Sequence, residues 1–458
     1  MKKQQNRALV SGRASSKTIR LVALLVVMAL ALPFLHHGQL SWLTPRSTNG
    51  VRTWKSAIPR MPFSRSRSGI ICDVSQKRYD VCFVSGPTKM DPASRSLLLL
   101  HDPSKSSPPL TRKLRPLPRK WEAEVMLNVT EVTVSSAINA TTCDFYHDGA
   151  ALVFSTGGYM GNLYHDFDDG MIPLFITSRF IAGDFVLVIS EYHNWWVRKY
   201  YQVLRRYSPH RIINLDNETS THCFHRGAAV GLISHDDMTI EPSLMPDGED
   251  MLRFRAFLGE AFFDKYYHLH RHSTDGELRP VMVMVVRNGS RSVRNQADVV
   301  GLAERVGFAV RTFTPTKVTD LNEAFRTINA SHAMMGVHGA GLTHSLFLRP
   351  GSVLLQVIPL GADWVSETCF GRPARAMGLK YLPYQIGVEE SSLVEKYESN
   401  DVVLRDPRAV VRKNWANTKS IYLEAQSVKL DLERLRRYLV VAYRHAKRFM
   451  EEADGANH

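Results

Sequence analysis

The sequence predicts an α/β protein made of two doubly wound, Rossmann-like halves that face each other, at residues 121–275 and 276–426. Two observations predict this class. Apolar runs of five or six residues alternate with amphipathic stretches of helical spacing, and the alternation occurs twice along the chain. Each half also carries a glycine-rich turn directly after one of its apolar runs. Because ligands of such sheets bind where the strands end, we expect a binding cleft between the halves.

The composition of the 458-residue chain is that of a folded protein, with 44% apolar and 22% charged residues. Its formal net charge of +14 is spread unevenly, because residues 1–120 carry a net +18 and the remaining residues a net −4. A nucleic-acid-binding domain needs its basic patch on the folded part of the chain. The charge distribution therefore excludes a nucleic-acid partner.

The N-terminus predicts a membrane anchor. Residues 1–20 form a basic cytosolic tail without acidic residues, and an apolar run follows within residues 21–40. This order predicts a single-pass signal anchor with the body on the lumenal side. The run is short for an average bilayer, and Ala29-Leu30-Ala31 leaves a cleaved signal peptide as the alternative. A lumenal body agrees with five glycosylation sequons, at Asn128, Asn139, Asn217, Asn288 and Asn329.

Two segments rich in Ser, Pro and Arg separate the anchor from the first half. Residues 41–70 are typical of a flexible stem. Residues 71–120 are interpreted as a basic lead-in, in which Cys72 and Cys82 enclose a nine-residue loop that suits a local disulfide. We expect ordered structure to begin near Trp121.

The expected elements alternate in both halves. In the first half we expect strands at 150–155, 185–190 and 211–215 and helices at 162–180 and 193–207. In the second half we expect strands at 281–286, 308–312, 333–337 and 353–358 and helices at 296–306, 318–328 and 341–348. An amphipathic helix at 427–451, within the C-terminal segment 427–458, closes the chain.

The second half contains the sharpest motif, a glycine-rich turn between an apolar strand and a helix. Gly339 and Gly341 let the backbone approach a ligand closely, and the helix start offers free N–H groups to an anion. The candidate phosphate-binding residues are His338, Gly339, Ala340, Gly341, Leu342, Thr343 and His344. The alternative is a turn used only for packing. A dinucleotide site fits less well, because Gly-x-Gly-x-x-Gly is absent.

Two arginines follow the first strand of the same half. Arg287 and Arg291 lie where a diphosphate on the glycine-rich turn would need cations, and guanidinium groups bind phosphate oxygens in pairs. Solvated loop charges are the alternative. A glycan on Asn288 would obstruct this site, so that sequon fits a glycan least well.

The first half places His and carboxylates after its own glycine-rich turn. Asn162, His165 and Asp169 are spaced to share one helix face. His or a carboxylate is the usual proton acceptor from a hydroxyl, so the candidates for a catalytic base are His165, Asp166 and Asp169. Asp166-Phe167-Asp168 is superficially similar to an Asp-x-Asp metal site. We expect no metal, because two cationic loops already serve the diphosphate. A purely structural His165 is the other alternative.

These blocks together resemble glycosyltransferase family 61. The resemblance rests on Asn-Leu-x-His-x-Phe-x-Asp from Asn162, Gly-Ala-Gly-Leu-Thr-His from Gly339, and Pro-Gly-Ser from Pro350. Residues 154–158, 173–177 and 371–375 are similar to its plant members, particularly the grass xylan arabinosyltransferases and xylosyltransferases.

The resemblance implies an inverting Golgi enzyme of the GT-B fold and type II topology. It implies an acceptor domain at 121–275, a nucleotide-sugar domain at 276–426, and transfer of arabinofuranose or xylose from a UDP-pentose to xylan. No cofactor is required. Cys369 replaces an aromatic residue usual in the family, which implies a free thiol and leaves Cys72–Cys82 and Cys143–Cys223 as disulfides. The alternative is an inactive family member that acts as a structural subunit of a Golgi xylan-synthesis complex. A serine hydrolase would lack its Gly-x-Ser-x-Gly turn.

Overall fold

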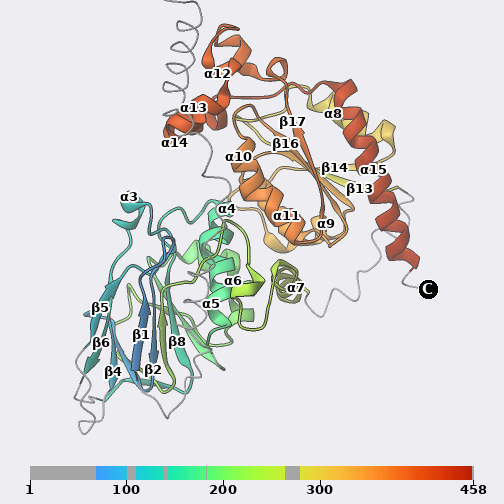
Figure 1. Cartoon of the computed structure of the whole chain (residues 1–458). Coiled ribbons are helices and arrows are strands. Elements are labelled where there is room, and N and C mark those ends of the chain that lie inside the picture. The colour runs from blue at the N-terminus through green and yellow to red at the C-terminus, as the bar shows by residue number, and fades with distance from the viewer. Residues whose placement is uncertain (1–68, 101–109, 138–141, 182, 264–278, 456–458) are drawn as a thin grey trace, which may run out of the picture. The chain divides into compact units, whose positions relative to one another are not determined.

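The computed structural model describes residues 69–100, 110–137, 142–181, 183–263 and 279–455 (Figure 1). The chain divides into a segment Met1–Pro59 and a compact unit Arg60–His458. The expected cytosolic tail and signal anchor, and the expected stem up to residue 68, lie outside the described residues. Among the residues that are described, no helix combines the length and the apolar character needed to cross a membrane.

The first half is built on a six-stranded sheet in the order β1-β2-β12-β8-β9-β10. Its parallel part consists of β8 (Ala150–Ser155), β9 (Phe185–Ser190), β10 (Ile213–Asn214) and β12 (Gly227–Val230). Two antiparallel strands extend it, β1 (Gly69–Asp73) and β2 (Val81–Ser85). The strands expected at 150–155 and 185–190 are confirmed, and only a short strand forms within 211–215.

A second six-stranded sheet covers one face of the first. It runs in the order β5-β6-β4-β3-β11-β7. Its strands are β3 (Thr88–Asp91), β4 (Ser96–Leu100), β5 (Thr111–Leu114), β6 (Val132–Ala137), β7 (Phe145–His147) and β11 (His222–Phe224). Side chains of the two sheets form one core, in which Val84 and Val153 pack with Leu97 and Val134.

Two expectations about the first half are therefore wrong. The described residues already form strands from Gly69 onward, well before Trp121, because the basic lead-in contributes to β1 and supplies β2 to β5. The first half is also not doubly wound, since a second sheet replaces one layer of helices. All five strands are short; β1, β3 and β5 mix charged with apolar residues, whereas β2 and β4 are short uncharged runs inside a stretch that was interpreted as a lead-in. In β3, for example, Thr88 and Met90 are buried while Lys89 and Asp91 are less so.

Helices cover the opposite face of the first sheet. The helix expected at 162–180 forms as α4 (Leu163–His165), a π-helical turn η1 (Asp166–Met171) and α5 (Ile172–Ser178). The helix expected at 193–207 is α6 (Asn194–Tyr207), whose Trp196 packs edge-on against Phe154 of β8. The remaining helical turns of this half are α3 (Ala123–Met126) and η2 (Pro242–Leu244).

The second half has a five-stranded parallel sheet in the order β14-β13-β15-β16-β17. Its strands are β13 (Val281–Val285), β14 (Ala309–Phe313), β15 (Ala333–Val337), β16 (Val353–Ile358) and β17 (Lys380–Gln385). Helices α8 (Gln296–Val306) and α15 (Leu432–Gly455) lie on one side of it, and α10 (Asp363–Ser366) and α11 (Arg372–Ala376) on the other (Figure 1). Leu302 of α8 and Leu435 of α15 share a core with the sheet.

Shorter elements complete this half. They are α9 (Leu321–Asn329), η4 (Ala340–Phe347), η5 (Glu367–Gly371), η6 (Val388–Glu390), η7 (Ser392–Glu395), α12 (Val402–Arg405), α13 (Pro407–Lys413), α14 (Trp415–Asn417) and η8 (Thr418–Glu424). The four strands and three helices expected here all form. The elements β15, β16 and α8 have the expected bounds, the others have shifted ends, and the turn after β15 continues as a 3-10 helix.

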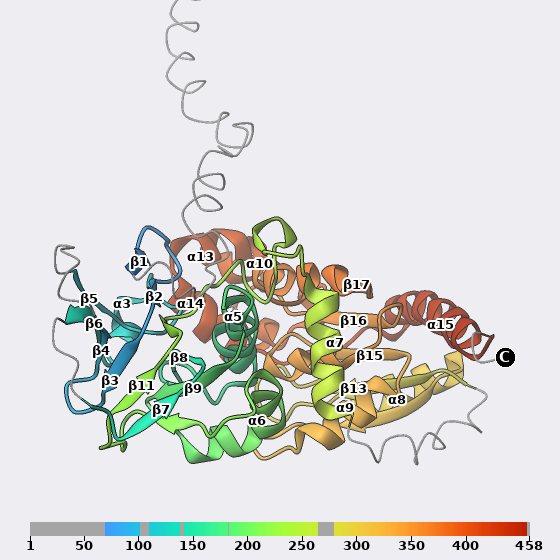
Figure 2. The ribbon, with the colours of Figure 1, turned by 90° about the horizontal axis from the view of Figure 1, so that it is seen from below.

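Helix α7 (Met251–Phe262) packs against both halves (Figure 2). Its Phe254 meets Phe167 of η1 edge-on, and its Phe262 meets Phe347 of η4 in the same way. The Arg255 side chain donates a 3.0 Å hydrogen bond from Nε to the carbonyl of Leu348. These contacts tie η1 and η4, which follow the two glycine-rich turns, to one helix.

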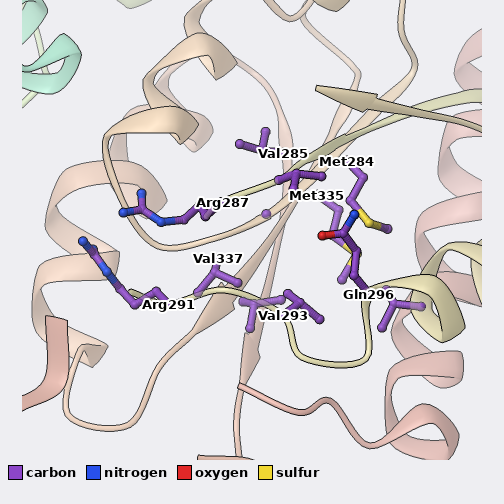
Figure 3. A pocket seen from close by; sticks show the side chains of 12 residues that line it. Met284, Val285, Arg287, Arg291, Val293, Gln296, Met335 and Val337 are labelled. Carbon is purple, nitrogen blue, oxygen red and sulfur yellow. The ribbon is translucent and has the colours of Figure 1, made fainter. Parts of the chain in front are cut away.

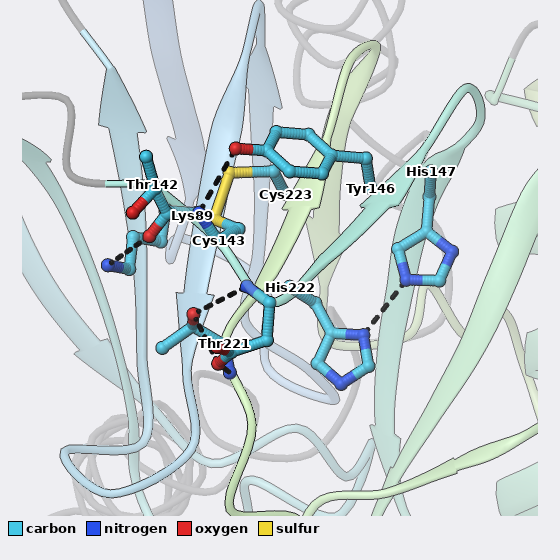
Figure 4. Close-up of a disulfide and its surroundings, with 9 residues drawn as sticks. Lys89, Thr142, Cys143, Tyr146, His147, Thr221, His222 and Cys223 are labelled. Atoms are coloured by element: carbon cyan, nitrogen blue, oxygen red, sulfur yellow. Dashed lines mark hydrogen bonds between the residues drawn. A yellow bond between two sulfur atoms is a disulfide. The ribbon is translucent and has the colours of Figure 1, made fainter.

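Two disulfides brace the first half, and they are the two pairs that the resemblance implied. Cys72–Cys82 joins the paired strands β1 and β2. Cys143–Cys223 joins the chain before β7 to β11 (Figure 4). Beside it, His147 Nε2 lies 2.9 Å from His222 Nδ1. Cys369 is free among the described residues.

Candidate active site

Both glycine-rich turns lie at topological switch points. In the second half, β13 has β14 on one side and β15 on the other, so the strand order reverses between β13 and β15. Arg287 and Arg291 follow β13, and Gly339 follows β15. In the first half the order reverses between β8 and β12, and His165 follows β8. Ligands of open α/β sheets bind at such positions.

In the first turn, Asn162 and Asp166 have structural contacts. The Asn162 side chain is exposed and caps α4 by accepting a 3.1 Å hydrogen bond from the Tyr164 amide. Asp166 is fully buried, and both of its carboxylate oxygens are occupied. Trp196 Nε1 and the Gly161 amide donate to Oδ1, and the Tyr200 hydroxyl donates to Oδ2.

Asp166 therefore holds the turn against α6 and does not face an acceptor. Burial raises the pKa of this carboxyl, and the hydrogen bonds from Gly161, Tyr200 and Trp196 oppose that rise. Of the three candidates for a base, this leaves His165 and Asp169. The Asn162 side chain likewise has a structural role, because it caps helix α4 and does not join His165 and Asp169 in the cluster.

His165 and Asp169 are hydrogen-bonded to each other, and the π-helical turn brings them together. His165 Nδ1 lies 3.0 Å from Asp169 Oδ2. A carboxylate can only accept, so the bond to Asp169 forms in the tautomer with the proton on Nδ1, in which the lone pair of Nε2 is available, whereas the contact of Nδ1 with Arg119 Nη2 forms in the other tautomer. The His165 side chain is 18% exposed and the Asp169 side chain 3%. A carboxylate that orients a partly exposed imidazole is the arrangement of a general base.

Arg119 sits at the centre of this cluster, and the sequence analysis did not single it out. Its Nε donates to Asp169 Oδ1 at 2.9 Å, and its Nη2 donates to Asp168 Oδ2 at 3.2 Å. The same Nη2 lies 2.9 Å from His165 Nδ1. In the sequence, Arg119 is recognisable only as one of several basic residues near the end of residues 71–120, which were interpreted as a lead-in.

The surroundings shift the pKa values of the two neighbouring aspartates in opposite directions. Burial raises the pKa of Asp168 well above its usual value, and the charge of Asp169 adds to this rise. Burial acts in the same direction on Asp169, but the hydrogen bond from His165 and the charge of Arg119 outweigh it and lower the pKa of Asp169. Asp169 is therefore the ionised partner of His165.

The second turn brings Gly339 against the two arginines. Gly339 has φ +149°, and a Cβ there would collide with Arg287 Nη1 and lie 3.2 Å from Arg291 Nη1. Arg291 itself has φ 56°, a strained conformation that costs about 1 kcal/mol or more and is typical of functional sites. Figure 3 shows Arg287 and Arg291 extending to the same side, away from the apolar Met284 and Met335.

The positive charge of these arginines is not balanced locally. In the part of the chain that the structure describes, neither Arg287 nor Arg291 forms an ion pair, whereas the adjacent Arg294 pairs with Glu395. Burial lowers the pKa of Arg291 to about 10, with a further contribution from the charge of Arg287. The charge of Glu424 acts in the opposite direction on Arg291, but no carboxylate of the described residues forms an ion pair with either arginine. Two close, half-buried guanidinium groups in this state favour an anionic ligand.

The other residues of the second turn are buried. His338 Nδ1 lies 3.1 Å from Gln356 Nε2, and burial lowers the pKa of this imidazole to about 3, with Arg291 and Arg287 contributing. His344 Nδ1 donates to the Gly341 carbonyl at 2.9 Å. Leu342 and Thr343 are fully buried and Ala340 is half-buried. The two histidines therefore support the turn, whereas the sequence had suggested that they donate to the ligand.

The two turns are connected through a pair of aromatic side chains. The Tyr164 ring meets the His165 ring at 5.2 Å and the Phe370 ring at 5.9 Å. Phe370 in turn meets His338 at 5.4 Å. The structure thus brings His165 and His338, from different halves, to the same region. Nothing in the sequence analysis pointed to Tyr164 or Phe370, because aromatic residues at such positions are usually core.

The sequons differ in exposure. Asn128, Asn217 and Asn288 are exposed, and Asn139 lies outside the described residues. Asn329 is 7% exposed, and its Oδ1 accepts a hydrogen bond from Arg255. A glycan on Asn329 is therefore incompatible with this packing, and that expectation is wrong.

Comparisons with known proteins agree with the geometry. The family described as Glycosyltransferase 61 matches residues 163–355, a region that contains His165, Asp169 and the glycine-rich turn of the second half. The chain is 39% identical to the xylan glycosyltransferase MUCI21 of Arabidopsis thaliana, over 86% of this chain and 83% of that protein. Two rice proteins (Oryza sativa subsp. japonica) are each 35% identical. They are the beta-1,2-xylosyltransferase XYXT1, over 86% of this chain and 87% of its own length, and the alpha-1,3-arabinosyltransferase XAT3, over 81% and 64%.

The fold and the paired turns thus define a glycosyltransferase. The chain belongs to glycosyltransferase family 61.

Proposed function

We propose that this protein transfers a pentose, arabinofuranose or xylose, from a UDP-sugar to xylan. The observation that carries the proposal is the pair Arg287 and Arg291, held unpaired against Gly339 at a switch point. Such a site suits a diphosphate, which nucleotide sugars contain. The names of the relatives supply the sugar and the acceptor: one is a xylan glycosyltransferase, one a xylosyltransferase and one an arabinosyltransferase.

In the proposed reaction, His165 Nε2 removes the proton from an acceptor hydroxyl. The hydroxyl oxygen then attacks the anomeric carbon from the side opposite UDP, a bond forms there, and the bond to the UDP oxygen breaks. The configuration at the anomeric carbon is therefore inverted. Asp169 holds the imidazole through Nδ1 and stabilises the imidazolium that forms. The hydrogen bond between His165 and Asp169 is what favours His165 over Asp169 as the base.

Negative charge develops on UDP as it leaves. Arg287 and Arg291 are already desolvated and oriented, so they stabilise this charge without reorganising. Positioned groups of this kind are typically worth about 3 kcal/mol each. The proposal needs no metal or other cofactor for the leaving group, because the two guanidinium groups supply the charge.

The setting of the enzyme is part of the proposal. We propose a GT-B arrangement in which the first half binds acceptor and the second binds nucleotide sugar. Support comes from the position of both turns at switch points. We also propose a type II Golgi membrane protein, possessing a signal anchor at 21–40 and a lumenal body, with other Golgi glycosyltransferases as partners. The basic tail before the apolar run and the exposed sequons support this topology.

A donor panel tests the proposal. The purified full chain is incubated with UDP-xylose, UDP-arabinofuranose, UDP-arabinopyranose, UDP-glucose or UDP-N-acetylglucosamine and a xylo-oligosaccharide, and NMR determines the product linkage. We expect transfer from one UDP-pentose with inversion at the anomeric carbon. Transfer from a UDP-hexose alone, retention of configuration, or no transfer from any donor would contradict the proposal.

A further inference from the structure

Three side chains in the first turn have the donor set and spacing of a divalent-cation site. His165, Asp168 and Asp169 each offer one ligand atom, and these atoms all lie within 4.8 Å of one another. Imidazole and carboxylate groups this close are ligands for ions such as Zn²⁺, Mn²⁺ or Co²⁺. Asp168 and Asp169 are also buried side by side, and each lies within ion-pair distance of the Arg119 guanidinium.

Arg119 contacts all three of these residues. It donates to Asp169 Oδ1 and Asp168 Oδ2, and its Nη2 lies 2.9 Å from His165 Nδ1. Arg119 is 8% exposed. A metal ion at the centre of the cluster would need the space that the guanidinium fills, so the two cations exclude each other.

Arg119 is itself fixed from the other side. Its Nη1 donates to Glu122, whose other carboxylate oxygen accepts from the Tyr159 hydroxyl at 2.7 Å. The guanidinium carbon also lies 5.0 Å from the Trp121 ring centroid and 5.4 Å from that of Tyr159. The group is therefore held in one orientation before any substrate binds.

We propose that Arg119 is the built-in cation of the active site, taking the place of a divalent metal and positioning the base His165 through Asp169. By binding Asp169 Oδ1, Arg119 leaves Oδ2 to hold the imidazole. Arg119 is a positioning residue and touches no substrate in this mechanism. The inference rests on the proposed function for the role of His165, but the cation exchange at the cluster can be measured without any sugar.

The proposal predicts that removing Arg119 uncovers a latent metal site. The matched control is Arg78, which also lies over the Trp121 ring, at 4.5 Å, and pairs with the neighbouring Asp237. Cobalt binding is followed by visible absorption and by calorimetry. We expect no binding at this cluster in the wild type or in Arg78→Ala. In Arg119→Ala we expect saturable binding of one Co²⁺, which Asp168→Asn abolishes in the double variant.

Kinetics supply the second readout. We expect Arg119→Ala to lower kcat by about 100-fold while KM for the donor changes less than threefold, because only the orientation of the base is lost. Arg119→Lys keeps a cation but cannot span three partners, so it should retain more turnover than the alanine variant and bind no Co²⁺. It also keeps the test valid if Arg119→Ala does not fold.

Two results would overturn the assignment. One is stoichiometric metal in the wild-type protein, with turnover lost on chelation and restored by metal. The other is a folded Arg119→Ala protein that binds no Co²⁺ and keeps wild-type kcat. If the wild type transfers no sugar but the cobalt results hold, the proposed function fails and the cation assignment stands.

Discussion

The two glycine-rich turns occupy equivalent places in their halves but differ in electrostatics. The first turn is internally balanced, because Arg119 pairs with Asp168 and Asp169, and Asp166 is saturated by three donors. The second turn is less balanced, because Arg287 and Arg291 lie against Gly339 and form no ion pair with a carboxylate of the described residues. The charges of the first turn are paired within the protein, whereas those of the second turn suit an anionic ligand.

This difference separates two tasks. A base must hold its orientation through every cycle, so a closed network of charges suits it. A nucleotide must bind and leave, so its site keeps unmatched charge that the ligand neutralises and product release restores. The comparison predicts that variants of the first turn impair turnover with little effect on UDP affinity, and that variants of the second turn impair both.

The largest effect is expected in the first turn. His165→Ala should lower kcat by about 1,000-fold, since general-base catalysis contributes about 10²–10⁴-fold, and Asp169→Asn should cause a similar loss by freeing the imidazole. Steady-state kinetics with the best donor measures both. His210→Ala, at an exposed histidine paired with Asp184, is the control and should be neutral. Wild-type kcat in both His165→Ala and Asp169→Asn would refute the assignment of the base.

Arg287→Ala should lower kcat by about 100-fold, because one preoriented donor to the leaving group is lost. Arg287→Lys should recover part of this loss, since it retains charge but not paired hydrogen bonds. Arg294→Ala, at an exposed arginine paired with Glu395, is the matched control. Unchanged turnover in a folded Arg287→Ala protein would remove this residue from the mechanism.

Gly339→Ala tests the close approach in the second turn. An added Cβ would collide with Arg287 and strain the backbone at φ +149°, so UDP affinity should fall about tenfold. Calorimetry with UDP provides the measurement. The control is Gly301→Ala in α8, where an added Cβ meets only the end of the Arg305 side chain. This variant should leave both UDP affinity and the free energy of unfolding undiminished. Equal UDP affinity in the wild type and Gly339→Ala would show that the turn does not touch phosphate.

The last prediction concerns the pH dependence of stability. Burial lowers the pKa of His338 to about 3, so this imidazole stays neutral in the folded protein while the unfolded chain takes up a proton near pH 6.5. Stability from His338 is therefore present above that pH and is lost on acidification, by about 2 kcal/mol between pH 7 and pH 5. Urea unfolding of His338→Gln at the two pH values should show a shallower dependence than the wild type. An unchanged dependence would mean that His338 is not held neutral.

The sequence predicted the parallel cores well because buried strands there are uninterrupted apolar runs. The strands β8, β9, β15 and β16 and helix α8 have the expected bounds. Strands β1 to β5 were missed because each is short and because they lie in a segment whose overall basic composition was interpreted as a lead-in. A half-buried edge strand and a basic linker look alike when only local pattern is available.

The candidate site was predicted in outline and corrected in detail. The glycines that follow two apolar strands predicted both turns. The four-residue spacing of His165 and Asp169 predicted that they lie on one helix face, where they are hydrogen-bonded. Sequence spacing could not show that Asp166 points inward or that Arg119, 46 positions before His165, completes the cluster. Such partners are set by tertiary packing between distant segments, which no local periodicity encodes.

Titration of UDP into three purified proteins tests the central claim most directly. The proteins are the wild type, His165→Ala and Arg287→Ala/Arg291→Ala, and calorimetry gives the dissociation constant of each. The account predicts equal affinity for the first two and at least 100-fold weaker binding by the arginine double variant. Equal binding by all three proteins, or no binding by the wild type at millimolar UDP, would contradict it.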